Sequence, residues 1–233
     1  ERGESRPMQT QFDTYLRAVG ADADVAQAMV QSVPSRLDRT WQTQYSGSGR
    51  NAVRNLVHIS ELEEADVEWF AGRDDFEITP EHYADAGIPQ RLPVDADLMT
   101  LLGFYVAEGS CSDRNGIRLS IGNGNVAFAP EIAERMTRVF GLAPTLYEVV
   151  DRAAELKLVN RVAAAAWQSL FGFRGAESHT KRIPDLVFNV PAALRLAFLR
   201  GYLRGDGTAA AGRVGFATSS YDLASGLMYL LSS

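Results

Sequence analysis

The sequence predicts an α+β fold in which two related units of helices and antiparallel strands follow residue 95. A nine-residue segment at 101–109 recurs in altered form at 199–207, 98 positions later. Each copy has small and apolar residues at helical spacing, and each is followed by segments with strand-like alternation. An internal repeat of this kind predicts two similar halves.

The overall composition is that of an ordinary globular protein. The chain has 233 residues, of which 46% are hydrophobic and 22% are charged. That is enough for a substantial core in one large domain or two small ones. No apolar run approaches the roughly 18 residues of a membrane span, so we expect no membrane partner. Since the chain has a single cysteine, it can form no internal disulfide, and we expect a cytoplasmic location.

The charge is distributed unevenly along the chain. A net charge of −6 argues against a nucleic-acid partner. However, residues 1–97 carry 18 acids and 9 bases, a net of −9, whereas residues 98–233 carry 11 acids and 14 bases, a net of +3. The basic part contains both copies of the repeat, which indicates a surface there that binds phosphates.

Residues 1–95 are predicted to be an acidic, mainly helical N-terminal region, either accessory or lying between functional blocks. Apolar residues at helical spacing predict two short helices within residues 7–33. The polar, Gly/Ser-rich residues 42–51 predict a loop. The acidic residues 60–97 contain three prolines and predict a helix with a connector, so the main boundary is placed near Asp95.

Residues 96–192 are predicted to form the first unit, in the order αββαββα. Asn115-Gly116 predicts the turn of a hairpin whose second strand is 117–121. The other predicted elements are helices at 97–107, 130–140 and 163–171, and a second hairpin that pairs 145–150 with 156–160.

Residues 193–233 are predicted to begin the second unit. The pattern predicts a helix at 193–205, an extended segment at 207–211, a strand at 213–218 and a helix from Tyr221. The second hairpin and the closing helix of the first unit have no counterpart here. We therefore expect the second unit to be truncated.

Small residues in the two nonapeptides predict a close helix–helix interface. Gly103 and Ala107 lie four residues apart in the first copy, as do Gly201 and Gly205 in the second. Residues four apart share a helix face, and small residues there allow two backbones to approach closely. The sequence therefore predicts that the two helices pack on each other.

Each predicted helix ends in a carboxylate, Glu108 or Asp206, followed by Gly109 or Gly207. We expect both glycines to end their helices in the left-handed conformation. The C-terminal end of a helix carries partial negative charge, so two acids held together there require a cation. A hard divalent ion, Mg²⁺ or Mn²⁺, fits this site best. Its predicted ligands are the two carboxylates, with backbone near Ala107 and Gly205.

The two nonapeptides resemble the paired motifs of LAGLIDADG (DOD-type) homing endonucleases, particularly those embedded in inteins. The defining positions are filled by Gly103, Ala107, Glu108 and Gly109, and by Gly201, Gly205, Asp206 and Gly207. A third element, His179-Thr-Lys181-Arg-Ile183-Pro184, resembles the Lys-x-Ile-Pro block that precedes the second motif in such proteins. The resemblance covers about residues 95–233.

The resemblance implies a fold with pseudo-two-fold symmetry, in which the motif helices form the centre and two sheets form a saddle over DNA. It implies that Glu108 and Asp206 bind metal at the scissile phosphates and that Lys181 is an electrostatic or water-positioning group. The implied function is site-specific cleavage of double-stranded DNA by a monomeric pseudo-dimer. The exteins of a host protein would be partners in the precursor, and the chain would be a truncated endonuclease region of an intein.

Several polar residues are predicted to contact DNA. Arg118 and Ser120 share one face of their predicted strand, opposite the apolar Ile117, Leu119 and Ile121. Ordinary solvated surface is the alternative for each candidate. Further phosphate or base contacts are predicted for Arg114, Lys157, Arg161 and Arg213.

Two other functions remain open from the sequence. One is a non-cleaving DNA-binding protein on the same fold, either a regulator or a decayed endonuclease. Both acids are present and no helix-turn-helix module is evident, which favours the nuclease. The other is an RNA-splicing maturase, for which a more basic surface is expected.

Overall fold

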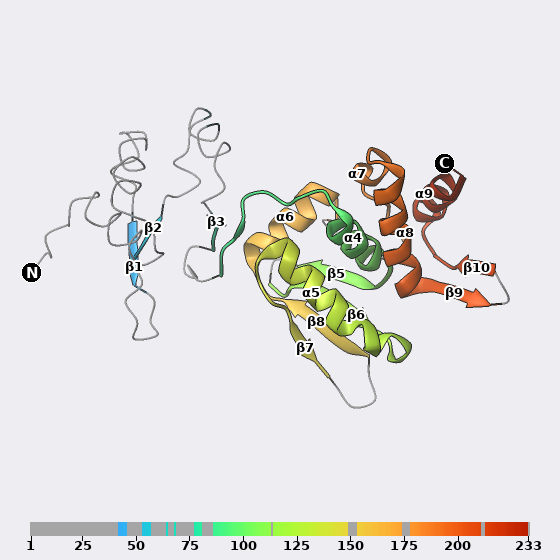
Figure 1. Cartoon of the computed structure of the whole chain (residues 1–233), viewed down its shortest axis with the longest axis horizontal. Helices are drawn as coiled ribbons and strands as arrows, with labels where there is room; N and C mark the ends of the chain where they lie inside the picture. The colour runs from blue at the N-terminus through green and yellow to red at the C-terminus, as the bar shows by residue number, and fades with distance from the viewer. Residues whose placement is uncertain are drawn as a thin grey trace, which may run out of the picture. The chain divides into compact units, whose positions relative to one another are not determined.

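The computed structural model describes residues 42–45, 53–56, 64, 68, 77–80, 86–112, 114–148, 153–173, 178–210 and 213–232. The chain divides into two compact units. The first comprises residues 1–76 and 81–85, and the second comprises residues 77–80 and 86–233. Both copies of the repeat lie in the second unit, which is labelled from β3 to α9 in Figure 1.

The described residues before Pro93 include two short antiparallel strand pairs. Strands β1 (Gln42–Tyr45) and β2 (Val53–Leu56) pair within the first unit. The prediction of a loop at 42–51 is therefore wrong for residues 42–45, where cross-strand pairing overrides the polar composition. The predicted helices within 7–33 lie outside the described residues. Strands β3 (Glu77–Ile78) and β4 (Ile88–Pro89) pair within the second unit.

The first repeat has the predicted order of elements, with one addition. A 3₁₀ helix, η4 (Asn123–Phe128), leads into the second α-helix. The elements are α4 (Ala96–Glu108), β5 (Gly109–Ser112), β6 (Gly116–Ile121), α5 (Ala129–Phe140), β7 (Thr145–Tyr147), β8 (Ala154–Leu158) and α6 (Arg161–Phe171). In the second hairpin β7 is shorter than the predicted strand 145–150, while β8 has the five residues predicted but begins and ends two positions earlier than 156–160.

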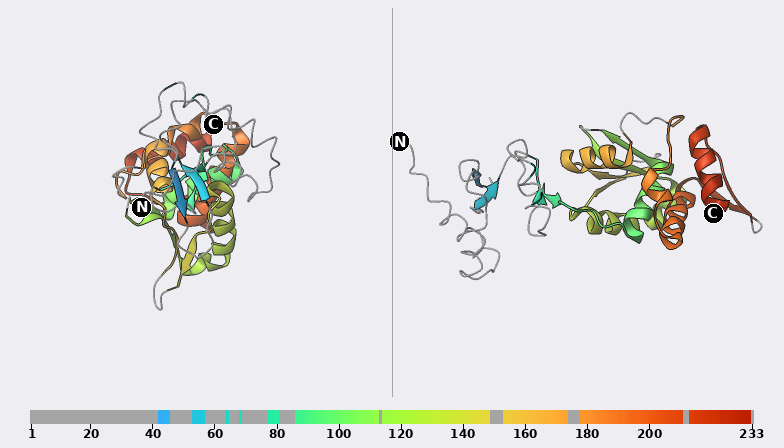
Figure 2. Two further views of the ribbon diagram at one scale, coloured as in Figure 1. Left: turned by 90° about the vertical axis from the view of Figure 1, so that its left-hand side faces the viewer. Right: turned by 90° about the horizontal axis from the view of Figure 1, so that it is seen from above.

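The second repeat begins with the same succession of a helix, two strands and a helix. Its elements are α8 (Ala192–Asp206), β9 (Gly207–Ala210), β10 (Arg213–Phe216) and α9 (Tyr221–Ser232). The short helix α7 (Asp185–Phe188), which precedes α8, has no counterpart in the sequence prediction. Strands β9 and β10 pair with each other, and Figures 1 and 2 show α9 beside α8.

The first repeat forms an antiparallel sheet in the order β5-β6-β8-β7, with one apolar face. Alternate residues such as Ile117, Leu119 and Leu156 are buried on that face, where α4 and α6 pack. Ring contacts extend this core beneath the helices, since Trp167 of α6 lies 5.4 Å from Tyr105 of α4 and 5.6 Å from Phe140 of α5, centroid to centroid. The sheet thus has its opposite face free for polar residues.

Helix α4 is buried on all sides, because it packs on the sheet, on α5 and on α8. Every residue from Leu101 to Ala107 is buried. A helix that is apolar all round belongs in a protein core or a membrane. In the part of the chain that the structure describes, no helix is long and apolar enough to cross a membrane. Asp95 begins α4 by accepting a hydrogen bond from the backbone N–H of Leu98 at 2.9 Å.

Helices α4 and α8 pack against each other through reciprocal glycine contacts. A Cβ at Gly103 would overlap the carbonyl oxygen of Phe198, and a Cβ at Gly201 would overlap that of Thr100. Because each glycine has no side chain, the backbone of the other helix can pack directly against it. Near the helix ends, a Cβ at Gly205 would lie 2.5 Å from the Cβ of Ala107. Larger side chains than those of Ala107 and Gly205 would therefore push the two helix ends apart.

Gly109 and Gly207 do not adopt the left-handed conformation predicted for them. Their φ values are −92° and −78°, both in extended backbone. Glycine is required there for space, because a Cβ at Gly109 would overlap the Tyr105 ring and one at Gly207 would overlap the Leu203 carbonyl oxygen. The chain leaves each helix directly into a strand, so the extended conformation is the one that the following element needs.

Replacing Gly103 by alanine should destabilise the protein, because the new methyl group would force α4 and α8 apart. Overpacking of this kind costs about 1–3 kcal/mol, to be measured as the change in the free energy of unfolding in urea. The matched control is Gly124→Ala, whose Cβ would meet nothing within 4 Å. Equal unfolding free energies for the two variants would contradict the close-packed interface.

A paired-carboxylate site at the helix ends

The two motif carboxylates occupy the last positions of the two packed helices. Glu108 ends α4 and Asp206 ends α8. A Cβ at Gly205 would lie 3.0 Å from Cγ of Glu108, so the end of α8 lies directly against the Glu108 side chain. Burial raises the pKa of Glu108, and the negative charge of Asp206 raises it further, which indicates that the two carboxylates share one electrostatic environment.

Lys181 lies at the same site and joins the two repeats. Its Nζ donates a hydrogen bond of 3.0 Å to the carbonyl oxygen of Ala107, in the last turn of α4. Its own carbonyl oxygen accepts a 2.6 Å hydrogen bond from Oγ of Ser220. That same Oγ accepts a hydrogen bond from the backbone N–H of Leu223 and caps the start of α9. Lys181 is therefore held between the end of α4 and the start of α9.

The residues that follow Lys181 fix its position by packing. Ile183 is buried, and its side chain lies against Gly226 of α9, where an added Cβ would approach Cδ1 of Ile183 to 3.0 Å. Pro184 is also buried and directly precedes α7. The block from Lys181 to Pro184 is thus an anchored connector, which explains how a lysine far from both motifs in sequence reaches the site.

Burial and charge act in opposite directions on the three ionisable groups. Burial raises the pKa of Glu108 and of Asp206, while the positive charge of Lys181 lowers both. Burial lowers the pKa of Lys181, and the two carboxylates raise it. The net pKa shift of both acids is upward, so one lysine does not fully compensate two partly buried carboxylates.

The donor set at this site fits a hard divalent cation. Glu108 and Asp206 supply carboxylate oxygens, which Mg²⁺ prefers, and Mg²⁺ usually keeps several waters and takes only one or two carboxylates. Within the described ranges there is no group of three or more His, Cys, Asp or Glu that could hold a metal ion. Of the predicted backbone ligands, the Ala107 carbonyl already accepts a hydrogen bond from Lys181.

Tyr202 lies next to this site, and the sequence motifs did not indicate it. It lies one turn before Asp206 on α8, its side chain is fully buried, and its hydroxyl has no hydrogen-bond partner among the described residues. Burial, with a smaller effect of the Asp206 charge, raises the pKa of Tyr202 to about 12. The hydroxyl therefore remains protonated and can act as a hydrogen-bond donor. The corresponding position of the first motif is Phe104.

Three of the predicted DNA contacts lie together on the polar face of the sheet. One row across the strands consists of Ser110, Arg118, Lys157 and Thr145, which are in register. The neighbouring row consists of Ser120, Glu155 and Tyr147. Arg118, Ser120 and Lys157 therefore share one surface, and the carboxylate of Glu155 lies among them.

The other predicted DNA contacts are not grouped with these three. Arg114 is exposed in the turn between β5 and β6. Arg161 is the first residue of α6, which packs on the opposite, apolar face of the sheet. Arg213 begins β10, where its backbone pairs with that of Ala210.

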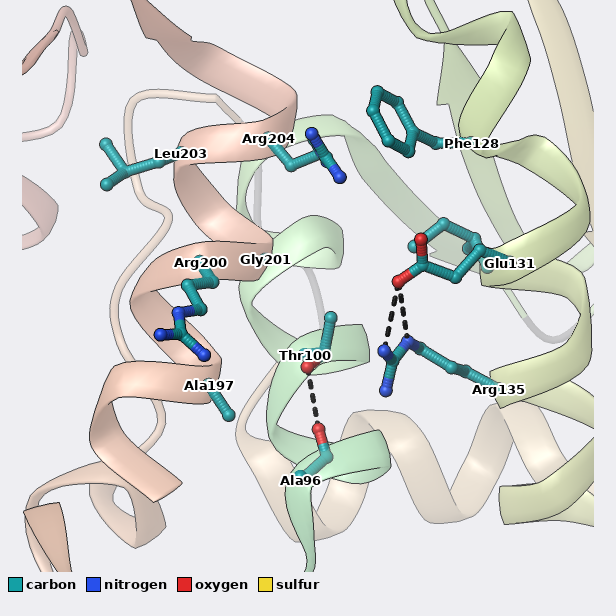
Figure 3. Close-up of a pocket in the computed structure, with 11 residues that line it drawn as sticks. Ala96, Thr100, Phe128, Glu131, Arg135, Ala197, Arg200, Gly201, Leu203 and Arg204 are labelled. Carbon is teal, nitrogen blue, oxygen red and sulfur yellow. Dashed lines mark hydrogen bonds and ion pairs between the residues drawn. The ribbon is translucent and has the colours of Figure 1, made fainter. Parts of the chain in front are cut away.

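A separate cavity of about 570 Å³ lies between α4, α5 and α8 (Figure 3). Arg200 and Arg204 of α8 line it, and the Arg204 guanidinium stacks 3.2 Å from the ring centroid of Phe128. Across the cavity, Arg135 pairs with Glu131 on α5 at 3.0 Å. None of the site residues Glu108, Asp206 and Lys181 lines this cavity, so it is distinct from the paired-carboxylate site.

Comparison with known proteins identifies a known type of domain within the chain. Residues 193–233 match the family model described as a LAGLIDADG-like domain. A DNA polymerase of Thermococcus kodakarensis is 31% identical over 202 residues, which are 81% of this chain and 11% of that protein. A DNA polymerase of Thermococcus hydrothermalis is 28% identical over 203 residues, again 81% of this chain and 11% of the relative.

An uncharacterized protein of Methanocaldococcus jannaschii is 26% identical over 126 residues, which are 52% of this chain and 14% of that protein. The chain thus spans only a small fraction of the length of these relatives. The family match begins at the start of α8 and contains the second nonapeptide, which packs through Gly201 on the helix of the first. By its motifs, its helix pair and this match, the chain contains a LAGLIDADG-like domain.

Proposed function

We propose that the chain is the endonuclease region of an intein, which cleaves both strands of a specific DNA site with a divalent metal. The observation that carries this proposal is the meeting of Glu108, Asp206 and Lys181 at the ends of two closely packed helices. Two neighbouring carboxylates whose negative charge is only partly balanced by a lysine bind a cation readily. A neighbouring ammonium group can stabilise negative charge on a phosphate.

The polar face of the β5-β6-β8-β7 sheet is the proposed DNA-binding surface. Antiparallel strands can enter the major groove and present alternate side chains to base edges. Arg118 and Ser120 are neighbours on that face of β6, and Lys157 pairs with Arg118 across to β8. Arginine and lysine there can contact phosphates or read guanine, and serine can donate or accept at either kind of base pair.

The residues of the site have distinct proposed roles in phosphodiester hydrolysis. Glu108 and Asp206 would hold the metal, which when bound supplies charge neutralisation and lowers the pKa of a coordinated water. Lys181 would stabilise negative charge that develops on the phosphate, from a position fixed by its hydrogen bond to Ala107.

The lengths of the matched segments support placement within an intein. A segment of 202 residues that makes up 11% of a DNA polymerase is what an inserted element in a much longer host would give. A related segment also occurs in an uncharacterized protein from another organism. Occurrence of one segment in differently named proteins favours a mobile element over a polymerase domain.

Replacing Asp206 by asparagine should abolish cleavage, because the variant loses a metal ligand while keeping the shape of the side chain. The assay incubates the protein and Mg²⁺ with a plasmid that carries the uninterrupted insertion site, and follows linearisation on a gel. Losing a group that stabilises transition-state charge costs about 10²–10³-fold in rate, and we expect at least that loss for Asp206→Asn and for Glu108→Gln.

The matched control for the cleavage assay is Asp222→Asn, which changes an exposed acid at the start of α9. It should cleave at the wild-type rate. Wild-type cleavage by Asp206→Asn would refute the metal-ligand assignment. If wild type and all three variants bind the site and none cleaves it, the chain is a non-cleaving DNA-binding protein instead.

The raised carboxyl pKa values predict how stability depends on pH and metal. A carboxyl whose pKa is raised by folding contributes stability that is present below its unfolded pKa and lost as pH rises through its folded pKa. In chelator at pH 7, Asp206→Asn should therefore unfold at a higher temperature than wild type. This difference should shrink as pH falls through the raised pKa that Asp206 has in the folded protein, and it should be absent below 3.8, the ordinary Asp value.

Added Mg²⁺ should reverse that order of stability. At 100 times its dissociation constant, a ligand that binds only the folded state stabilises by about 2.7 kcal/mol, which calorimetry would detect as a rise in the Tm of wild type. Asp206→Asn should show a much smaller rise. An equal rise in both proteins would place the bound metal elsewhere.

A further inference from the structure

Glu155 is an acid on the sheet face that is proposed to contact DNA. Its strand, β8, alternates Ala154, Leu156 and Leu158 on the buried face with Glu155 and Lys157 on the polar face. A carboxylate on a surface that meets phosphates is unfavourable unless it has a specific task there. The contacts that Glu155 makes with neighbouring side chains indicate what it does on this surface.

The two carboxylate oxygens of Glu155 hold one cation each. Oε1 lies 3.4 Å from Nη1 of Arg118 on β6, and Oε2 lies 2.6 Å from Nζ of Lys157 on β8. The Glu155 side chain is 26% exposed and that of Lys157 is 29% exposed, so this ion pair is partly shielded from water. Glu155 thus bridges the two cations that were predicted to bind DNA.

Both cations have a second restraint besides Glu155. Nε of Arg118 donates a 3.0 Å hydrogen bond to Oγ of Ser110 on β5. Nζ of Lys157 lies 4.7 Å from the centroid of the Tyr147 ring on β7, in a cation–π contact. With two contacts each, the guanidinium and the ammonium are held over the sheet, whereas unrestrained long side chains could follow any nearby phosphate.

We propose that Glu155 is a specificity-determining residue, which restrains Arg118 and Lys157 so that they serve base reading and not indiscriminate phosphate binding. Ser110 holds Nε of Arg118 and Glu155 holds Nη1, which together restrain the guanidinium group. A guanidinium held in place is what recognition of a guanine edge requires. The single negative charge of Glu155 also offsets one of these two positive charges, which lowers the affinity of this face for DNA of any sequence. The inference rests on the proposed DNA-binding function of the sheet.

The test is Glu155→Gln, which preserves side-chain shape but removes the charge that holds the two cations. Binding to a fluorescent 30-bp duplex of mixed sequence is measured from 50 to 200 mM salt. Each new phosphate contact steepens the plot of log affinity against log salt by about 0.9, so release of both cations should steepen it by about 1–2. The matched control is Glu148→Gln, which removes an exposed charge next to β7.

The second measurement is selection from a library of randomised duplexes, followed by sequencing. Wild type and Glu148→Gln should enrich the same bases, whereas Glu155→Gln should lose the preference at one or two adjacent positions while still binding. The double variant Arg118→Gln/Glu155→Gln should have a shallower salt dependence than Glu155→Gln, because one of the two cations that Glu155 restrains is then absent. Melting curves of all variants verify that they are folded.

The outcomes separate this inference from the function on which it rests. If Glu155→Gln and Glu148→Gln have the same salt dependence and enrich the same bases, Glu155 is an ordinary surface ion-pair residue and the inference is overturned. If wild type binds no duplex in a salt-dependent way, the DNA-binding function itself is refuted.

Discussion

The close approach of α4 and α8 is the constraint on which the rest of this structure depends. Gly103 and Gly201 each receive a backbone carbonyl from the opposite helix. This contact fixes the axial position of one helix against the other. Since each helix ends in its motif acid, the same contact determines where Glu108 and Asp206 lie. The repeated segment therefore both packs the two helices together and positions the two acids.

Lys181 partly offsets the electrostatic repulsion between Glu108 and Asp206. Its ammonium group interacts with both carboxylates and donates to the end of α4, while Ser220 ties its backbone to α9. Burial nonetheless keeps the pKa of both acids above the ordinary value. A site that retains unfavourable charge in the absence of metal is prepared to bind one, and this is the physical basis of the proposed function.

Much of this arrangement could be predicted from the sequence, because the informative signals are local and repeated. Helical spacing of small residues predicted the helix pair, and strand alternation predicted which face of β6 carries Arg118. The predicted conformation of Gly109 was wrong because a C-terminal glycine commonly signals a left-handed cap. Here the following strand and the Tyr105 ring determine the backbone, and those contacts are visible only in three dimensions.

Other features depend on pairing between distant segments, which a single sequence does not specify. The hydroxyl of Ser220 reaches Lys181 across 39 positions of sequence, although a serine before α9 could have been predicted as its cap. The bridge from Glu155 to Arg118 requires the register of β6 on β8. The signal that could have found it is the spacing of Glu155 and Lys157, which places both on one strand face.

The central claim is that the ends of α4 and α8 form one cation site. The most direct measurement is anomalous diffraction from crystals of the protein grown with Mn²⁺. We predict a peak between the carboxylates of Glu108 and Asp206, with oxygen ligands from both. A peak bound by other residues, or carboxylates that lie apart with no ion between them, would contradict the account.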